Sequence, residues 1–414
     1  MSVPLRRQPQ FLRLWTGQTI SVFGDQVSML AIPLAAVLTL HASAFEMGLL
    51  TAAGWLPHLL LSLHAGLWID RRGRRRQTMI AADIGRAVVL ASIPAAWALD
   101  ALTMTQLYTV SFLVGALTVF FDLSWSTIFT SIVAKENYVD ANSKLFQSRA
   151  LSQVAGPSVG GFLVQLLRAP GAILVDAASF LGSAFFLARI SVQEPPPEEH
   201  DSSLTQRQRL GAGLSFIFAS PLFRASLGSF ATINFFSLMF NALFVLYATR
   251  DLHVRPGVLG IVLGAGAVGG VLGAAVAPRL SRRLGVGPAL VLGTILFPAP
   301  LVLVPAAAGP RPLVLGMLFA AEFFSGLGVM ILDVNGNSIG AALTPDRLRA
   351  RVSGAHRVIN YGVRPIGSLL AGGLGTWIGL RPTLWIASVG AMLGVAWLVP
   401  SPIPQLRELP EQAT

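Results

Sequence analysis

The sequence predicts an all-α membrane protein with twelve transmembrane helices in two pseudo-symmetric six-helix bundles. Composition is the first reason, because 53% of the 414 residues are hydrophobic and only 12% are charged, giving a mean hydropathy of +0.66. Segment length is the second. Residues 257–277, for example, carry no charge over about 20 residues, the length a helix needs to cross a hydrocarbon core. Strands of a membrane barrel would instead alternate polar and apolar residues.

Charged or turn-forming residues separate twelve apolar segments. These lie at residues 12–40, 46–69, 77–99, 104–134, 144–168, 171–190, 221–249, 256–279, 286–307, 312–342, 352–379 and 381–400. The stretch "SVQEPPPEEHDSSLTQRQRLGAG" after the sixth is polar and Pro-rich, which is typical of a linker. The sequence therefore predicts an N-terminal bundle at 1–190, a cytoplasmic linker at 191–212, and a C-terminal bundle with a short tail at 213–414.

Lys and Arg gather in the loops on the side of the N-terminus, as at residues 71–76. By the positive-inside rule both termini are cytoplasmic. The formal net charge of +11 is then explained by loop residues that orient the chain in the bilayer and contact anionic membrane lipids. No nucleic-acid partner is expected. The first apolar segment is too long for a signal peptide and is expected to remain as a span.

Cofactor and metal chemistry is not expected. The chain has no cysteine, which excludes disulfides and thiolate metal sites, and it shows no clustered metal ligands and no phosphate-binding Gly-Lys-Ser/Thr loop. The glycine-rich stretch "GAGAVGGVLG" (264–273) lies inside an apolar span, where close helix packing explains it. An enzyme is therefore not predicted.

The two halves resemble each other. "FFDLSWSTIFTSIV" with the following span parallels "ILDVNGNSIGAALT" with its following span, so that Asp122 corresponds to Asp333 and Pro157 to Pro365. Internal repeats of this kind are typical of secondary transporters, whose substrate sites lie near the bilayer midplane.

The loop "GLWIDRRGRRR" resembles the signature between spans two and three of the major facilitator superfamily. The matching residues are Gly66, Asp70, Arg71, Gly73, Arg74 and Arg75. Most of the chain is similar to the macrolide-efflux-type drug:proton antiporters, a branch that also contains siderophore exporters. This resemblance implies a multi-pass protein of the bacterial cytoplasmic (inner) membrane, with the loop acting as a cytoplasmic gate.

Asp70 is the informative residue of this loop, because anchoring alone needs no carboxylate. At a span end it could accept hydrogen bonds from exposed N–H groups and face the positive dipole of a neighbouring helix. The resemblance implies that this helix is span eleven, which begins near Arg351. The alternative is that Asp70 pairs with Arg71 or Arg74.

Span five carries "SQVAGPSVGG" (152–161), which is similar to the motif of exporters that work by exchange. Gly156, Pro157, Gly160 and Gly161 are in place. Small residues also let helices approach closely, so the alternative is that these residues serve the packing of span five against span eight. Both interpretations can be true at once. Many proton-linked relatives carry an Arg midway along span four, but residues 105–134 of this chain contain no Lys or Arg.

Two acids are expected to couple transport to protons. Asp25 lies about 16 Å along a helix from Leu14, near the midplane, and Asp122 lies at similar depth in span four. Carboxyls at that depth are costly and are functional candidates. Structural pairing, with Arg149 or His58, is the alternative. Asp83, Arg86 and Asp176 lie nearer span ends and are expected to form structural pairs.

Substrate contacts are predicted from residue type. Asn234 and Asn241 lie seven apart on one face of span seven, with aromatic neighbours. The candidate substrate-binding residues are Asn234, Phe235, Phe236, Asn241, Glu322, Asp333 and Arg357. Aromatic walls with few polar groups suit bulky amphiphiles, although ordinary helix packing also accounts for each Phe.

The expected function is export of hydrophobic or amphiphilic small molecules by proton antiport and alternating access. The partners are then the substrate, protons and membrane lipids, and the protein is expected to be a monomer. One alternative is a siderophore, lipid or metabolite carrier, including a uniporter. Another is a membrane sensor or assembly protein that keeps the fold without transport.

Overall fold

The computed structural model describes residues 5–194, 206–345 and 348–409. Within these ranges the chain forms helices and turns and no strand, which confirms the predicted all-α class. Nine helices in this part are long and apolar enough to cross a membrane. The count of twelve spans and the cytoplasmic termini stay predictions.

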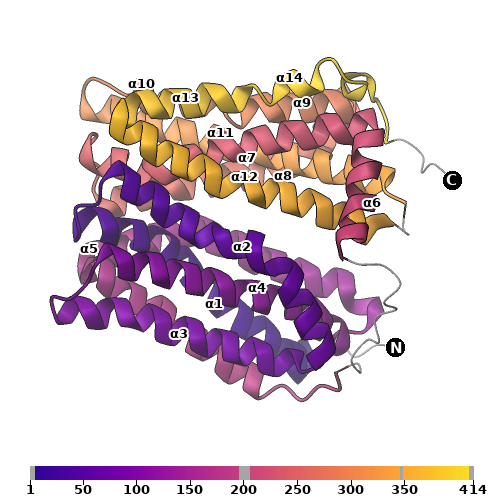
Figure 1. Cartoon of the computed structure of the whole chain (residues 1–414), viewed down its shortest axis with the longest axis horizontal. Helices are drawn as coiled ribbons and strands as arrows, with labels where there is room; N and C mark the ends of the chain where they lie inside the picture. Colours follow the sequence, from indigo (N-terminus) through magenta and orange to yellow (C-terminus); the bar gives the residue numbers. More distant parts are fainter. Residues whose placement is uncertain (1–4, 195–205, 346–347, 410–414) are drawn as a thin grey trace. The chain divides into compact units, whose positions relative to one another are not determined.

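The chain divides into two compact units, one of Met1–His200 with His253–Gly264 and one of Asp201–Leu252 with Ala265–Thr414. The helices of the first unit, labelled in Figure 1, are α1 (Pro9–Leu38), α2 (Ala44–Arg72), α3 (Arg75–Ala98), α4 (Met104–Ile132) and α5 (Tyr138–Ala188). Those of the second are α6 (Gln206–Ala219), α7 (Pro221–Arg250), α9 (Val286–Leu296), α10 (Leu303–Ala306), α11 (Arg311–Leu343), α12 (Arg349–Trp377), α13 (Leu380–Met392) and α14 (Val395–Leu398). Helix α8 (Pro256–Leu284) begins in the first unit and continues into the second.

Helix α5 contains two of the predicted segments. It spans 51 residues but breaks at Arg168, whose φ of 62° and ψ of 165° are not helical. Ala169 and Pro170 follow the break, and proline suits the first turn of the helical segment that begins there, because an N–H at that position would have no partner within the helix. The Arg168 guanidinium lies 5.8 Å from the ring centroid of Trp97, at the end of α3.

Local sequence explains where α2 begins and ends. Ser43 and Glu46 form a capping box, in which the Ser43 hydroxyl accepts from Glu46 N at 3.3 Å and Glu46 Oε2 accepts from Ser43 N at 2.7 Å. Gly73 ends the helix at φ 63°, and its N–H donates to Ile69 O. Glycine adopts this left-handed conformation without strain.

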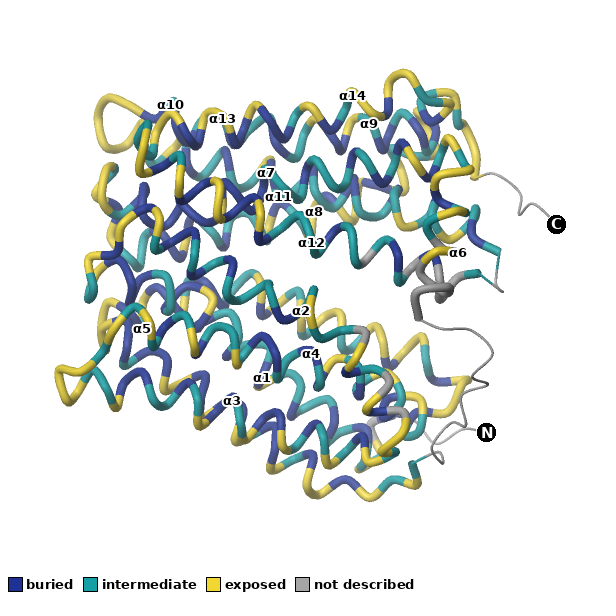
Figure 2. The backbone as a smooth tube through the Cα atoms, viewed as in Figure 1, coloured by how far each residue is buried: buried dark blue, intermediate teal, exposed yellow. Residues whose placement is uncertain are grey.

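The first unit is held together by helix packing around α5. Helix α5 contacts α1 and α3, while α2 contacts α4. A core cluster includes Phe11, Leu14, Met79, Phe121 and Ile128. Figure 2 shows buried and exposed positions interspersed along the helices of this unit, with exposed positions also in the turns between them.

In the second unit, α7 contacts α12 and α13, and α11 contacts α9. Helices α8 and α11 interlock through glycines. A Cβ added to Gly269 would overlap the carbonyl oxygen of Phe323, and one added to Gly326 would overlap that of Gly266. Small residues at a helix interface allow such backbone contact. These two pairs set the α8–α11 spacing.

Candidate functional site

A group of charged side chains lies inside the first unit. Asp83 and Arg86 on α3 form an ion pair, and their side chains are 0% and 3% exposed. The Arg86 guanidinium also lies 4.6 Å from the ring centroid of Phe121 and 4.0 Å from that of Phe180. Aromatic rings stacked against a guanidinium stabilise its positive charge and restrict the movement of the side chain. The pair expected from the sequence is therefore present.

Asp25, near the middle of α1, is half-buried. It interacts electrostatically with Arg86 and Asp83, and also with Asp122 on α4 and Arg149 on α5. Asp122 is exposed. The structure thus brings the two predicted proton-coupling acids within electrostatic reach of each other.

Asp176, in the second part of α5, is 1% exposed. Its Oδ1 accepts from Ser179 Oγ at 3.0 Å. A Cβ added to Gly24 of α1 would lie 2.5 Å from Asp176 Oδ1, so the glycine beside Asp25 admits this carboxyl. The sequence placed Asp176 among structural pairs near span ends, and it did not predict this contact with α1.

The loop of the predicted gate follows α2. Gly66 has open space beside it, Arg71 and Arg74 are exposed, and Arg75 is buried. The Asp70 side chain lies outside the described residues. The acid that caps the next helix is Glu194, whose Oε2 accepts from Arg75 N at 2.5 Å. Its other oxygen accepts from the amide of the following residue at 3.0 Å, which places a negative charge at the N-terminus of α3. Glu194 lies in the Pro-rich stretch predicted to be a linker, where the sequence shows no periodicity that would have indicated a capping residue.

The motif glycines of α5 face two other helices of the same unit. Gly156 lies against the side chain of Gln26 on α1, and Gly160 against Val27. Gly161 faces the start of α8, where an added Cβ would overlap Pro256 O.

The contact between α5 and α8 is reciprocal. A Cβ on Gly260 would overlap Pro157 O, and Ser158 Oγ donates to Gly260 O at 3.4 Å. Spans five and eight therefore pack backbone to backbone here.

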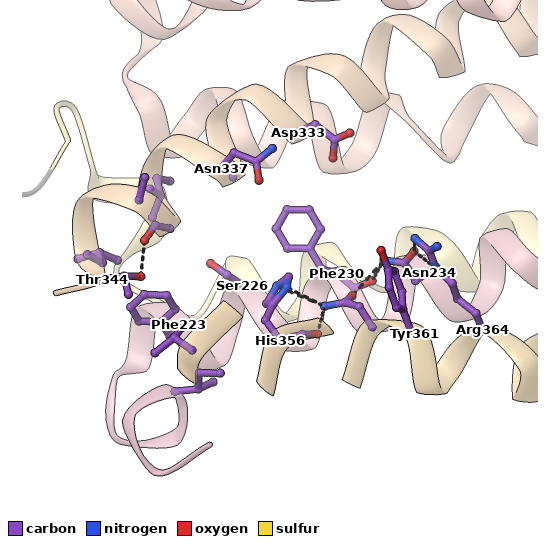
Figure 3. Close-up of a pocket in the computed structure, with 18 residues that line it drawn as sticks. Phe223, Ser226, Phe230, Asn234, Asp333, Asn337, Thr344, His356, Tyr361 and Arg364 are labelled. Carbon is purple, nitrogen blue, oxygen red and sulfur yellow. Dashed lines mark hydrogen bonds between the residues drawn. The ribbon is translucent and has the colours of Figure 1, made fainter. Parts of the chain in front are cut away.

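The second unit contains a pocket of about 620 Å³ between α7, α11 and α12. The labelled lining residues in Figure 3 are Phe223, Ser226, Phe230, Asn234, Asp333, Asn337, Thr344, His356, Tyr361 and Arg364. Asp333 and Asn337 lie on α11, on the other side of the pocket from Asn234 and Arg364. This volume is typical of small-molecule sites.

The pocket contains two of the predicted substrate residues, Asn234 and Asp333. Other predicted residues lie elsewhere. Phe236 packs on Gly390 of α13, and Glu322 lies beside Gly266 of α8. The backbone of Phe235 lies against Gly367 of α12.

Asn241 is exposed and donates to Ser237 O of its own helix at 2.9 Å. The Arg357 side chain lies outside the described residues.

A chain of hydrogen bonds joins α7 to α12 along the pocket wall. Arg364 donates to Asn234 Oδ1 through Nε at 3.0 Å and Nη2 at 2.8 Å. Asn234 Nδ2 donates to Asn360 Oδ1 at 3.1 Å, and Asn360 Nδ2 donates to His356 O at 3.0 Å. The pocket is therefore more polar than the sequence predicted. His356, Asn360 and Arg364 are four apart, and this helical spacing was the available signal.

Replacing Asn234 with leucine is expected to destabilise the protein by about 2 kcal/mol. The change keeps the volume but removes the acceptor of a charged donor, and such bonds contribute about 1.5–3 kcal/mol. The matched control is Asn241→Leu, seven residues along α7, which loses a bond only to its own helix. Thermal unfolding in detergent measures both, and equal losses would contradict the prediction.

The family model for "Transmembrane secretion effector" matches residues 2–413. The chain is 27% identical to the multidrug efflux pump Tap of Mycolicibacterium fortuitum, over 98% of each chain. It is 28% identical to the pump of that name from Mycobacterium tuberculosis (strain H37Rv), over 97% of this chain and 95% of that one.

Solved structures agree in fold. A bacterial homologue of the iron transporter ferroportin, in an inward-facing state, gives a TM-score of 0.75 at 17% identity, covering 96% of this chain and 99% of that one. The nucleoside transporter NupG gives a TM-score of 0.73 at 11% identity, covering 94% of this chain and 98% of that one.

The match to the family model covers nearly the whole chain. It confirms the resemblance found in the sequence, the assignment as a transporter rather than an enzyme, and a multi-pass protein of the bacterial inner membrane. The chain belongs to the transmembrane secretion effector family of major facilitator superfamily transporters.

Proposed function

We propose that this protein exports hydrophobic or amphiphilic small molecules across the cytoplasmic membrane by proton antiport and alternating access. The proposal rests on Asp25. This carboxyl lies near the middle of an apolar helix, half-buried, and interacts with Arg86 and Asp122. An acid in that position is costly and is therefore a candidate for a function, and a carboxyl is suited to binding and releasing a proton.

The pocket of the second unit is the proposed substrate site. Phe223 and Phe230 offer aromatic faces, whereas Asn234 and Asp333 offer polar contacts. An amphiphile needs both kinds of wall. The direction of transport is taken from the Tap pumps, whose name describes multidrug efflux.

The two family motifs supply the conformational parts of the proposal. The loop from Gly66 to Arg75 is proposed as the cytoplasmic gate, with Asp70 as its acceptor for a helix N-terminus. Gly156, Pro157, Gly160 and Gly161 are proposed to seal the cytoplasmic path through the packing of α5. That packing includes the close approach of Gly161 to Pro256.

Adding ethidium to the purified protein in weakly buffered detergent solution is expected to release protons. Binding of the cation displaces protons from carboxyls in a proton antiporter, so release should saturate together with ethidium fluorescence. A pH-indicator dye measures the release. Ethidium binding without proton release would argue against antiport and for a uniporting carrier.

A further inference from the structure

Asp176 is a buried acid that the proposed coupling through Asp25 and Asp122 leaves unused. Its side chain extends from α5 toward α1 and is 1% exposed. Ser179 Oγ donates a hydrogen bond to it at 3.0 Å. Gly24 gives it room against α1, immediately before Asp25 in the chain. Ser28, one turn after Asp25, faces it as well. Asp176 is thus packed against the helix turn that carries Asp25.

The charges around Asp176 do not balance. The charged groups that act on it or on Asp25 are Asp25 on α1, Asp83 and Arg86 on α3, Asp122 on α4, and Arg149 on α5. Arg86 already pairs with Asp83, and Arg149 is exposed. If Asp25 and Asp176 were both ionised, two negative charges would lie inside the helix bundle beside one neutral ion pair. Bringing like charges together in a low-dielectric interior is costly, and a bound proton removes the cost.

Arg86 has room for one more acceptor. Within the part of the chain that the structure describes, its Nε has no hydrogen-bond partner, although the side chain is only 3% exposed. Burying an unpaired guanidinium donor is costly. Arg86 interacts electrostatically with both Asp25 and Asp176. A carboxylate that has lost its proton can therefore use this N–H.

From these contacts we propose that the second proton-binding residue beside Asp25 is the buried Asp176, in place of the exposed Asp122. Asp25 and Asp176 each bind one proton, and Arg86 Nε donates a hydrogen bond to the carboxylate of whichever acid is deprotonated. In each step the O–H bond of a carboxylic acid breaks, the proton leaves to the solution, and the carboxylate keeps the electron pair. The idea rests on the proposed antiport and sets its stoichiometry at two protons per cycle.

Ethidium makes this stoichiometry measurable because it carries one positive charge. Exchange for one proton moves no net charge, so a membrane potential cannot drive it. Exchange for two protons carries one positive charge inward per ethidium exported, so a potential alone drives accumulation. Proteoliposomes with a potassium diffusion potential and no pH gradient separate the two cases.

The wild type is expected to accumulate ethidium under the membrane potential alone. Asp176→Asn, which keeps an acceptor for Ser179, should lose that response and retain accumulation under a pH gradient. The matched control is Asp100→Asn, an exposed acid in the turn after α3 at φ 52°, where asparagine is well tolerated. The control should behave as the wild type.

Each other outcome has one meaning. If the wild type responds to the pH gradient only, or if Asp176→Asn keeps the response to the potential, the second proton site is overturned while antiport stands. If neither gradient drives the wild type, the proposed antiport fails. Infrared spectra then decide whether Asp176 binds a proton, through the carbonyl stretch of a buried carboxylic acid.

The infrared measurement does not depend on transport. Asp176→Asn should remove one carboxylic acid band, and Asp25→Asn a different one. If Asp176→Asn does not fold, Ser179→Ala should shift the frequency of the Asp176 band alone. A spectrum unchanged by the Asp176 and Ser179 substitutions would overturn the proposal.

Discussion

Replacing Asp25 with asparagine is expected to abolish the ethidium accumulation that a pH gradient drives in proteoliposomes. Asparagine has nearly the same size but cannot bind a proton there. Asp25 is half-buried whereas Asp176 is 1% exposed, so we expect the proton of Asp176 to reach the solution only by way of Asp25. One pH unit supplies about 1.4 kcal/mol per proton, enough for about a tenfold gradient per exchanged proton. In proteoliposomes with the variant, the ratio of ethidium concentration inside to outside should stay at about one.

The loss must be one of coupling and not of folding. Downhill ethidium flux through Asp25→Asn should therefore persist, because the proposed substrate pocket lies in the second unit. Asp100→Asn is again the matched control and should keep the full gradient. Proton-driven accumulation that survives in Asp25→Asn would remove Asp25 from the coupling mechanism.

The second large effect is expected at the glycine contact between α8 and α11. In Gly326→Ala the new methyl group would overlap the carbonyl oxygen of Gly266, so the helices must separate. Overpacking of this kind costs about 1–3 kcal/mol, and here the obstacle is backbone, which cannot rotate away. The variant should unfold at a lower temperature than the wild type, measured in detergent.

Helix α11 also contains a control glycine, Gly316, whose replacement by alanine is expected to raise the unfolding temperature and not lower it. A Cβ on Gly316 meets no atom within 4 Å. Gly316→Ala should therefore stabilise α11, because alanine is favoured over glycine in helices by up to about 1 kcal/mol. Two Gly→Ala changes that shift the unfolding temperature equally would show that the α8–α11 contact is not tight.

The helical class and the family could be predicted from the sequence, because both depend on local features. Uninterrupted apolar segments predict spanning helices, and the motif from Gly66 to Arg75 is contiguous. The turn at Gly73 follows from the conformational freedom of glycine, and the structure has it in the left-handed region.

The surroundings of Asp176 could not be predicted in this way. A soluble helix shows its buried face through apolar periodicity, but a membrane helix is apolar on every side. Which helix Asp176 faces depends on Gly24, about 150 residues away in the chain. Glu194 was missed for a similar reason, because capping of α3 requires the chain to return from the end of α5.

The pocket helices α7, α11 and α12, together with α8, are joined by two kinds of attraction that respond differently to distance. Hydrogen bonds between Asn234 and Arg364 hold α7 against α12, and Ser281 Oγ donates to Asn335 Oδ1 at 2.7 Å to hold α8 against α11. Across the pocket, Asp333 and Arg364 attract each other through space. A hydrogen bond fails within a few tenths of an ångström, whereas Coulomb attraction declines gradually. If the pocket binds the exported compounds, as proposed, we expect α11 to move relative to the α7–α12 pair to fit compounds of different width, because only the through-space attraction crosses the pocket. One site could then bind chemically varied substrates.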